Sequence, residues 1–251
     1  MIILLTGKPG IGKSTVIEKF IRLNAMPSSW VMTKAILQPK TNIRAGFRAI
    51  NSDAVERIIS HKTDIQSDAV IGENHVDIDA VNAMFAVALV NAQASKEKLT
   101  IIDEIGPIQL LSEDFSNSLA QAFNTQPNIV ASIHYNDERL SKYRESPNNL
   151  LLEVTNSNRN MLPDALVAVT ENLNVIKSLN EKQRKAFSSL LMQYAQRASS
   201  LQIQKLTSNA IHYVTEGNVK QIGDDHWQVR GKHDLHDVLQ NHETFECDCD
   251  L

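Results

Sequence analysis

The 251-residue chain has little cysteine and no long hydrophobic run. Its two cysteines, Cys247 and Cys249, are separated by one residue, which is too close for an ordinary structural disulfide and favours a reducing environment. The apolar run at the N-terminus ends at Thr6, too early for a signal peptide or a membrane span. These absences predict a cytoplasmic protein with no membrane partner.

Neither sign of charge dominates. The chain has 25 Lys and Arg against 29 Asp and Glu, a formal net charge of −4, so nothing attracts it as a whole to nucleic acid. Such binding would require a local basic surface. A hydrophobic content of 42% is ordinary, and the length allows one large domain with a smaller appendage. There is no internal repeat or low-complexity segment.

The first motif lies at residues 7–15, where GKPGIGKST matches the pattern GxxxxGK[ST]. Glycines let backbone N–H groups curl around phosphate oxygens, and the following helix directs its positive N-terminus at them. Lys13 would supply charge to the β- and γ-phosphates, and Ser14 a hydroxyl to Mg²⁺. An apolar strand precedes the motif and a helical pattern follows it. The predicted nucleotide-binding residues are Gly7, Lys8, Pro9, Gly10, Ile11, Gly12, Lys13, Ser14 and Thr15.

A second motif is the apolar run at residues 99–102, which delivers Asp103 and Glu104 at the carboxyl end of a predicted strand. Parallel sheets bind ligands at this edge. Asp103 is suited to holding Mg²⁺, directly or through water, and Glu104 to activating the attacking water as a general base. A base favours hydrolysis over a simple binding switch. The alternative is a pair of solvated acids at a strand end.

Other polar residues are weaker candidates. Ser132 and His134 end a predicted strand, so one of them could sense the γ-phosphate, although exposed loop histidines are common. Arg159 also follows a strand and could stabilise transition-state charge as a catalytic residue beside Lys13 and Glu104; a surface salt bridge is the alternative. Arg44 and Arg48 could be only strand-edge charges.

Apolar strands alternate with helical patterns, which predicts an α/β protein with a mainly parallel sheet covered by helices on both faces. Residues 30–36 and 45–50 are expected to form a hairpin. Further strands are expected at residues 2–5, 99–102, 128–133 and 150–154, and helices at residues 78–94 and 115–123.

The composition changes after about Val175. Residues 177–205 contain six Lys or Arg and one acidic residue, with apolar residues at helical spacing. Shorter β-like runs follow at residues 211–214, 219–222 and 227–229. We therefore expect two units, residues 1–173 and 174–251, the second a small helical and β appendage.

Several motifs together resemble the small nucleoside-triphosphatase family first described in thermophiles, also called cancer-related nucleoside triphosphatases. They are GKPGIGKST, AGFRAI around Gly46, IGENHVD from Ile71, IIDEIGPIQL from Ile101, and TNSNRN at residues 155–160. The resemblance covers roughly residues 1–172 and implies a RecA-like core that slowly hydrolyses ATP, GTP and other triphosphates. The family usually has Glu at the position of Gln109 and Tyr-Gly at those of Asn74 and His75, which leaves nucleotide preference open.

The C-terminal part resembles the first half of a SWIM zinc finger, through residues 222–229 and the pair Cys247 and Cys249. A structural zinc site needs four ligands, and the two cysteines supply only half of them. Zinc is therefore expected only if other ligands complete the site; the alternative is an acidic tail.

Three functions remain open. Mg²⁺-dependent hydrolysis of nucleoside triphosphates leads, and a nucleotide or nucleoside kinase is the alternative on the same loop. A kinase needs an acceptor pocket and usually an Arg-rich lid, for which only Arg139 and Arg144 are available. The third is a nucleotide-gated module that binds DNA or RNA through the basic helix and the finger-like region. No NKxD motif identifies the base.

Overall fold

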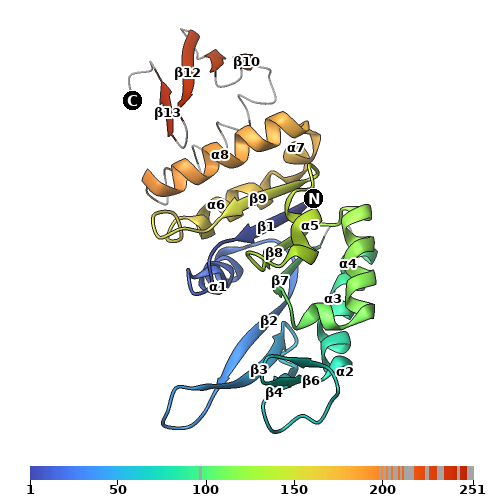
Figure 1. Ribbon diagram of the computed structural model, residues 1–251. Helices are drawn as coiled ribbons and strands as arrows, with labels where there is room; N and C mark the ends of the chain where they lie inside the picture. The colour runs from blue at the N-terminus through green and yellow to red at the C-terminus, as the bar shows by residue number, and fades with distance from the viewer. Residues whose placement is uncertain are drawn as a thin grey trace.

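A nine-stranded mixed sheet forms the centre of the computed structural model (Figure 1), which describes residues 1–95, 98–197, 199, 202, 205, 209, 211, 218–223, 226–230, 235–241 and 244–247. The strand order is β5-β6-β4-β3-β2-β7-β8-β1-β9. From β2 to β9 all neighbours run parallel, whereas β3 to β6 form an antiparallel extension. The strands are β1 Ile2–Thr6, β2 Ser28–Leu37, β3 Arg44–Asn51, β4 Glu56–His61, β5 Val70–Ile71, β6 Asn74–Val76, β7 Leu99–Ile105, β8 Ile129–Ile133 and β9 Asn149–Glu153.

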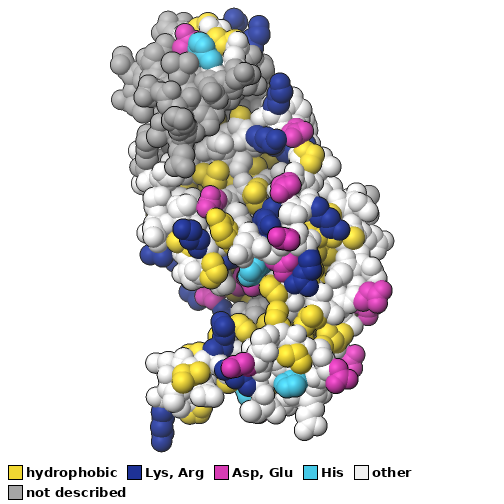
Figure 2. All heavy atoms as spheres, viewed as in Figure 1, with side chains coloured by type: hydrophobic (Ala, Val, Ile, Leu, Met, Phe, Trp, Pro, Cys, Tyr) yellow, Lys and Arg dark blue, Asp and Glu magenta, His cyan; other side chains and the backbone are white. Residues whose placement is uncertain are grey.

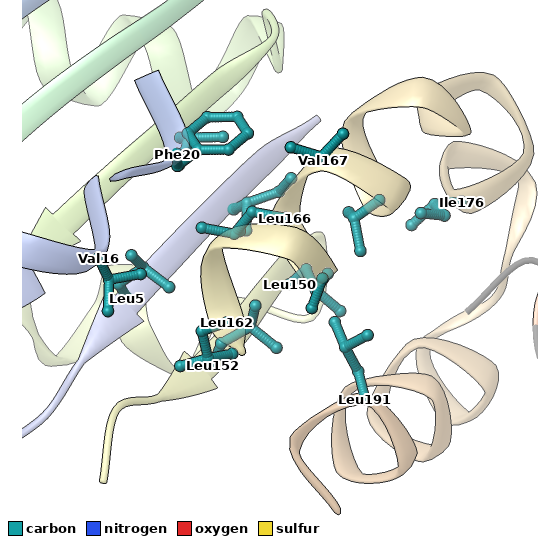
Figure 3. Packing of buried hydrophobic residues seen from close by; sticks show 14 of the residues in the cluster. Leu5, Val16, Phe20, Leu150, Leu152, Leu162, Leu166, Val167, Ile176 and Leu191 are labelled. Atoms are coloured by element: carbon teal, nitrogen blue, oxygen red, sulfur yellow. The ribbon is translucent and has the colours of Figure 1, made fainter. Parts of the chain in front are cut away.

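Both faces of the sheet are covered, as expected, because successive side chains of each central strand point to opposite sides. In β1, Ile3 and Leu5 belong to the core under α1, α6 and α8, while Ile2 and Leu4 belong to the core under α2, α3 and α4. Figure 3 shows the first of these cores. The helices are α1 Lys13–Leu23, α2 Ile78–Val81, α3 Val87–Ala94, α4 Glu113–Thr125, α5 Ser141–Arg144, α6 Leu162–Glu171, α7 Leu173–Ser178 and α8 Glu181–Arg197, with a π-helical turn at Asn82–Ala86 and 3-10 turns at Gln109–Leu111 and Glu138–Leu140.

The predicted fold class is confirmed, and most differences from the predicted elements are local. The hairpin of β2 and β3 is present, and the predicted helix at residues 78–94 is a continuous helical run that contains the π-helical turn. Strand β7 continues to Ile105, so Asp103 and Glu104 lie within it rather than after it. Strands β4, β5 and β6 have no clear sequence signal, because β5 has two residues, β6 has three, and half of β4 is exposed.

The single basic helix expected at residues 177–205 is wrong: α7 ends at Ser178, α8 spans Glu181–Arg197, and Ser199 is not helical. Asn180 and Gln183 break the run by capping α8 reciprocally: Asn180 N–H donates to Gln183 Oε1 at 2.9 Å, and Gln183 N–H donates to Asn180 Oδ1 at 3.0 Å. This is a capping box, whose N-x-x-Q signature is present in the sequence.

Helix α8 packs on the core and along the sheet edge. Phe187 and Leu191 are fully buried in the same core as β1 and α6. Ser188 Oγ donates to Leu151 O, and Glu153 N–H donates to Met192 Sδ at 3.1 Å, so α8 covers the backbone of the outermost strand β9. The unit boundary near residue 173 stays a prediction, while α7 and α8 share the core of the residues before it.

A separate four-stranded antiparallel sheet follows, in the order β10-β11-β12-β13. Its first two strands confirm the runs at residues 219–222 and 227–229, whereas Ile211, expected in a strand, is helical and buried in the core. Across the described parts of the chain, no helix is long and apolar enough to cross a membrane. The strands are β10 Val219–Gly223, β11 His226–Arg230, β12 Leu235–Asn241 and β13 Thr244–Cys247.

The packing of α8 can be tested by truncating Phe187, which is 0% exposed. Phe187→Ala should lower the free energy of unfolding by about 3–5 kcal/mol, because it removes a buried aromatic side chain and leaves a cavity. Lys185→Ala, whose side chain is 74% exposed on the same helix, is the control and should change it little. Denaturant titration measures both. Equal stabilities for the two variants would contradict the packing of α8 on the core.

Candidate functional site

The turn between β1 and α1 has the shape that a phosphate-binding loop requires. Gly7 and Gly12 have φ of 143° and 110°, in the region that favours glycine. A Cβ at Gly7 would also lie 2.7 Å from Val154 O, so a side chain cannot fit between the loop and the end of β9. Gly12 precedes the first turn of α1, whose N–H groups therefore face the loop. Lys13 Nζ donates to Gly7 O at 3.0 Å, across the concave side of the loop.

Asp103 lies in β7 beneath this loop and is 1% exposed. Its Oδ1 accepts a hydrogen bond from Ser132 Oγ, and the hydroxyl of Ser14 also bonds the carboxyl group. Burial raises the pKa of Asp103, opposed by these hydroxyls and by the charges of Lys34 and Lys13. Its other oxygen, Oδ2, is buried without a hydrogen-bond partner.

This oxygen set fits Mg²⁺. A buried, unpartnered carboxylate oxygen beside a serine hydroxyl is the kind of hard ligand that Mg²⁺ prefers. No group of three or more His, Cys, Asp or Glu side chains suitable for a metal occurs among the residues that the structure describes. Mg²⁺ is commonly bound by one or two carboxylates together with substrate phosphates, so a site with few protein ligands is consistent with this ion.

Glu104 is the next residue of β7 and faces the open cleft. Burial, followed by the neighbouring Asp103 carboxylate, raises the pKa of Glu104 to about 7, while the charge of Lys13 lowers it. The side chain folds against Gly106, where a Cβ would lie 2.8 Å from Glu104 Oε1. The Asp103–Glu104 peptide bond is cis. Such a carboxyl group can change its protonation state near neutral pH, as a general base must.

The loop and Glu104 line one cleft of about 970 Å³, which continues away from the loop toward the antiparallel extension. The hairpin β2–β3, the β5–β6 turn and the segment after β7 form its far side. Residues there that the sequence motifs did not single out as site residues are Thr33, Phe47, Lys62, Glu73, Ile108 and Tyr135. Thr33 and Phe47 lie in the paired strands β2 and β3, and the other four lie just after strands β4, β5, β7 and β8, so these residues meet at the cleft only once the sheet has formed.

The predicted loop residues divide into two sets. Those that line the cleft are Pro9, Gly10, Gly12, Lys13, Ser14 and Thr15. Gly7, Lys8 and Ile11 do not: Gly7 abuts Val154, Ile11 packs against the core, and Ile11 N–H donates to Lys8 O in the turn between them.

Ser132 and His134 have different positions. Ser132 is fully buried and contacts Asp103, so it supports the carboxylate rather than facing the cleft. His134 lines the cleft, its Nδ1 is buried without a hydrogen-bond partner, and burial lowers its pKa. Gln109 also lines the cleft, and its Nε2 donates to Thr33 Oγ1 at 3.2 Å. For Ser132 and His134, the sensing of the γ-phosphate or the attacking water stays a prediction.

The arginines are dispersed. Arg44 lies over the Phe47 ring, 4.7 Å from its centroid, and lines the cleft, whereas Arg48 pairs with Glu56 at 2.9 Å on the surface. Arg159 does not line the cleft; its Nη1 donates to Ile11 O at 3.3 Å, on the outside of the loop.

The two arginines considered for a kinase lid make local contacts. Arg139 pairs with Asp137 at 2.6 Å, and Arg144 Nη1 donates to His134 O at 2.9 Å. Both guanidinium groups are therefore bonded to residues of the same short segment and do not extend over the phosphate loop.

Zinc binding and nucleic-acid binding by the C-terminal part of the chain stay predictions. Cys247 belongs to β13, and Cys249 lies outside the described residues, so zinc binding is not tested. In α8, Lys185 pairs with Glu181 at 2.9 Å and Arg184 Nε donates to Pro147 O at 2.9 Å, so part of the expected basic surface is already engaged. On the face shown in Figure 2, acidic and basic side chains are interspersed rather than gathered by sign.

Comparisons with known proteins agree with this geometry. A family model described as NTPase matches residues 2–167. The nucleoside-triphosphatase THEP1 of Thermotoga sp. is 31% identical over 170 residues, covering 67% of this chain and 95% of that protein. The THEP1 of Aquifex aeolicus is 29% identical over 178 residues, 68% of this chain and 99% of that protein.

Two solved structures are also similar. The crystal structure of Aquifex aeolicus THEP1 has a TM-score of 0.59 at 26% identity and covers 68% of this chain and 99% of its own. The solution structure of a human cancer-related nucleoside triphosphatase has a TM-score of 0.55 at 24% identity, covering 67% and 97%, and supports the fold. On the family-model match over residues 2–167 and the 31% identity with the Thermotoga protein, the chain belongs to the NTPase family that includes the THEP1 nucleoside-triphosphatases.

Proposed function

We propose that this chain hydrolyses nucleoside triphosphates, ATP and GTP among them, to the diphosphate and phosphate with Mg²⁺. The observation that carries the proposal is the pair Asp103 and Glu104 beside the phosphate loop. One carboxylate is buried with an unpartnered oxygen, and the other faces the cleft with a pKa near 7. Relatives that match two thirds of the chain are named nucleoside-triphosphatases.

Different residues of the chain would bind the phosphates, hold the metal ion and accept the proton. The loop N–H groups and Lys13 hold the phosphates, and Ser14 with Asp103 would hold Mg²⁺. A bound ion would supply positive charge to the phosphate groups of the substrate. Glu104 accepts a proton from the attacking water, which then forms the new bond to the γ-phosphorus as the bond to the β-phosphate oxygen breaks. Positioning and electrostatics account for most of such a rate enhancement.

Hydrolysis is favoured over phosphoryl transfer to an acceptor by the open cleft around Glu104 and by the local pairing of Arg139 and Arg144. A kinase normally excludes water from its reacting phosphate. All the proposed groups precede residue 173, so the sheet β10–β13 is not needed for the chemistry. The proposed setting of the reaction is the cytoplasm.

Lys13→Ala should remove nearly all hydrolysis and most triphosphate binding, because the phosphates lose their main countercharge. The fold should persist, since Lys13 lines the cleft and not the core. Lys19→Ala, an exposed lysine of the same helix, is the matched control and should keep the parent rate. Phosphate release and nucleotide titration measure the two effects. A Lys13→Ala protein that hydrolyses ATP at the parent rate would show that the loop is not the site.

The two acids should respond differently to removal of charge. Glu104→Gln should lower turnover by roughly 10²-fold or more while nucleotide and Mg²⁺ binding persist, the effect of losing a general base. Asp103→Asn should weaken binding and raise the Mg²⁺ concentration needed for half-maximal rate. Steady-state kinetics across a Mg²⁺ titration separates the two. Equal, mild losses in both variants would favour a structural role for the pair.

The rate should also depend on pH through Glu104. A general base works in its deprotonated form, and the raised pKa of Glu104, about 7, keeps much of it protonated in mildly acidic solution. The value of kcat/KM should therefore rise with pH up to about 7 and level off above it, reporting the free enzyme. Glu104→Gln should remove this limb of the profile. A wild-type profile that is flat across this range would contradict the assignment of Glu104.

A further inference from the structure

Arg159 and Glu104 lie on opposite flanks of the phosphate loop. The loop follows β1, which stands between β8 and β9; Glu104 belongs to β7, beyond β8, and Arg159 follows β9. Accordingly Glu104 lines the cleft with Lys13, and Arg159 does not. The Arg159 side chain lies instead against the outer side of the loop, where its Cδ would be 3.7 Å from a Cβ at Gly12.

The backbone that carries Arg159 is held firmly. Asn158 is 1% exposed and ties the segment after β9 into a closed turn. Its Oδ1 accepts from Thr155 N–H at 2.9 Å, and its Nδ2 donates to Glu153 O at 2.8 Å. Arg159 N–H donates to Thr155 O at 3.1 Å.

The guanidinium group of Arg159 is exposed and makes few contacts with the protein. Its Nη1 contact with Ile11 O is long, at 3.3 Å, and no ion pair of Arg159 occurs among the described residues. A cation on a fixed backbone, without a carboxylate partner, is available to a ligand beside the loop.

The direction of a bound nucleotide follows from the acids. The γ-phosphate must lie at the Glu104 side, because the base that activates the water has to reach it. The remaining phosphates then follow the loop N–H groups toward the start of α1. The sugar and base therefore leave the loop on the other flank, where Arg159 and the turn at residues 155–158 lie.

We propose that Arg159 and this turn form a nucleobase subsite, in which the planar guanidinium stacks on the face of the base. The proposal rests on the hydrolysis proposed above and replaces the transition-state role expected for Arg159 from the sequence. Arginine is attracted to aromatic faces, and every base has one, so stacking accepts purines and pyrimidines alike. The ligand class is thus any nucleoside triphosphate, with a modest advantage for the larger purines.

The test compares Arg159→Ala and Arg159→Trp with the parent chain, using ATP, GTP, CTP and UTP as substrates and inorganic tripolyphosphate as a competitive inhibitor. Arg159→Ala should raise KM for each nucleotide roughly tenfold with kcat nearly unchanged, the range of a lost stacking contact. Inhibition by tripolyphosphate, which has no base, should be as strong as in the parent. Arg159→Trp should restore KM, since it restores a flat surface without the charge.

Arg22→Ala, an exposed arginine at the end of α1, is the control and should leave KM, kcat and inhibition unchanged. Melting temperatures confirm that each variant is folded. A fall in kcat of roughly 10²-fold or more at constant KM, not rescued by Trp, would mean that Arg159 stabilises transition-state charge and would overturn the proposal. Unchanged KM in Arg159→Ala would overturn it too. Failure of the proposed hydrolysis is distinct, because the parent chain itself would then release no phosphate.

Discussion

The burial of the Asp103 carboxylate is the constraint on which the site depends. Removing a carboxylate from water is costly unless hydrogen bonds or cations compensate. Here Ser132 and Ser14 satisfy part of it, one oxygen has no partner, and the pKa of Asp103 is raised. A divalent cation at this oxygen would supply the missing compensation. In the proposed mechanism, the cost of burying this carboxylate therefore favours binding of the ion.

The same burial sets the properties of Glu104. The two carboxyl groups are adjacent in β7, but one is 1% exposed and the other faces the cleft. Burial in the surrounding protein, and then the Asp103 charge, raise the pKa of Glu104. Two chemically similar acids thereby acquire different protonation properties from their environments, and the proposed mechanism assigns one to metal binding and the other to proton transfer.

The phosphate loop and the acidic strand could be predicted because their chemistry is local. Gly7 and Gly12 are required by backbone geometry within a few residues, and Asp103 and Glu104 directly follow the apolar run at residues 99–102 within β7. The far side of the cleft could not be predicted in this way. Phe47 lies in the AGFRAI motif, but only the pairing of β3 with β2 and β4 places it at the cleft, and Lys62, just after β4, is held beside β3 by its N–H bond to Ala45 O. The break before α8 is a different kind of failure. Its capping box at Asn180 and Gln183 was present in the sequence and was outweighed by the helical spacing around it.

The contacts of strand β9 explain why the change in composition after about Val175 does not coincide with a boundary in the packing of the protein. On one side Val154 N–H, just after the strand, donates to Thr6 O at 2.8 Å and closes against Gly7. On the other side Leu151 and Glu153 bond to α8, although the family match ends at residue 167. An outer strand with unpaired backbone groups needs a cover, and here the cover comes from residues beyond the family region. The phosphate loop and α8 therefore both contact strand β9. Some basic residues of α8 lie on its exposed face, while apolar residues of the same helix pack in the core.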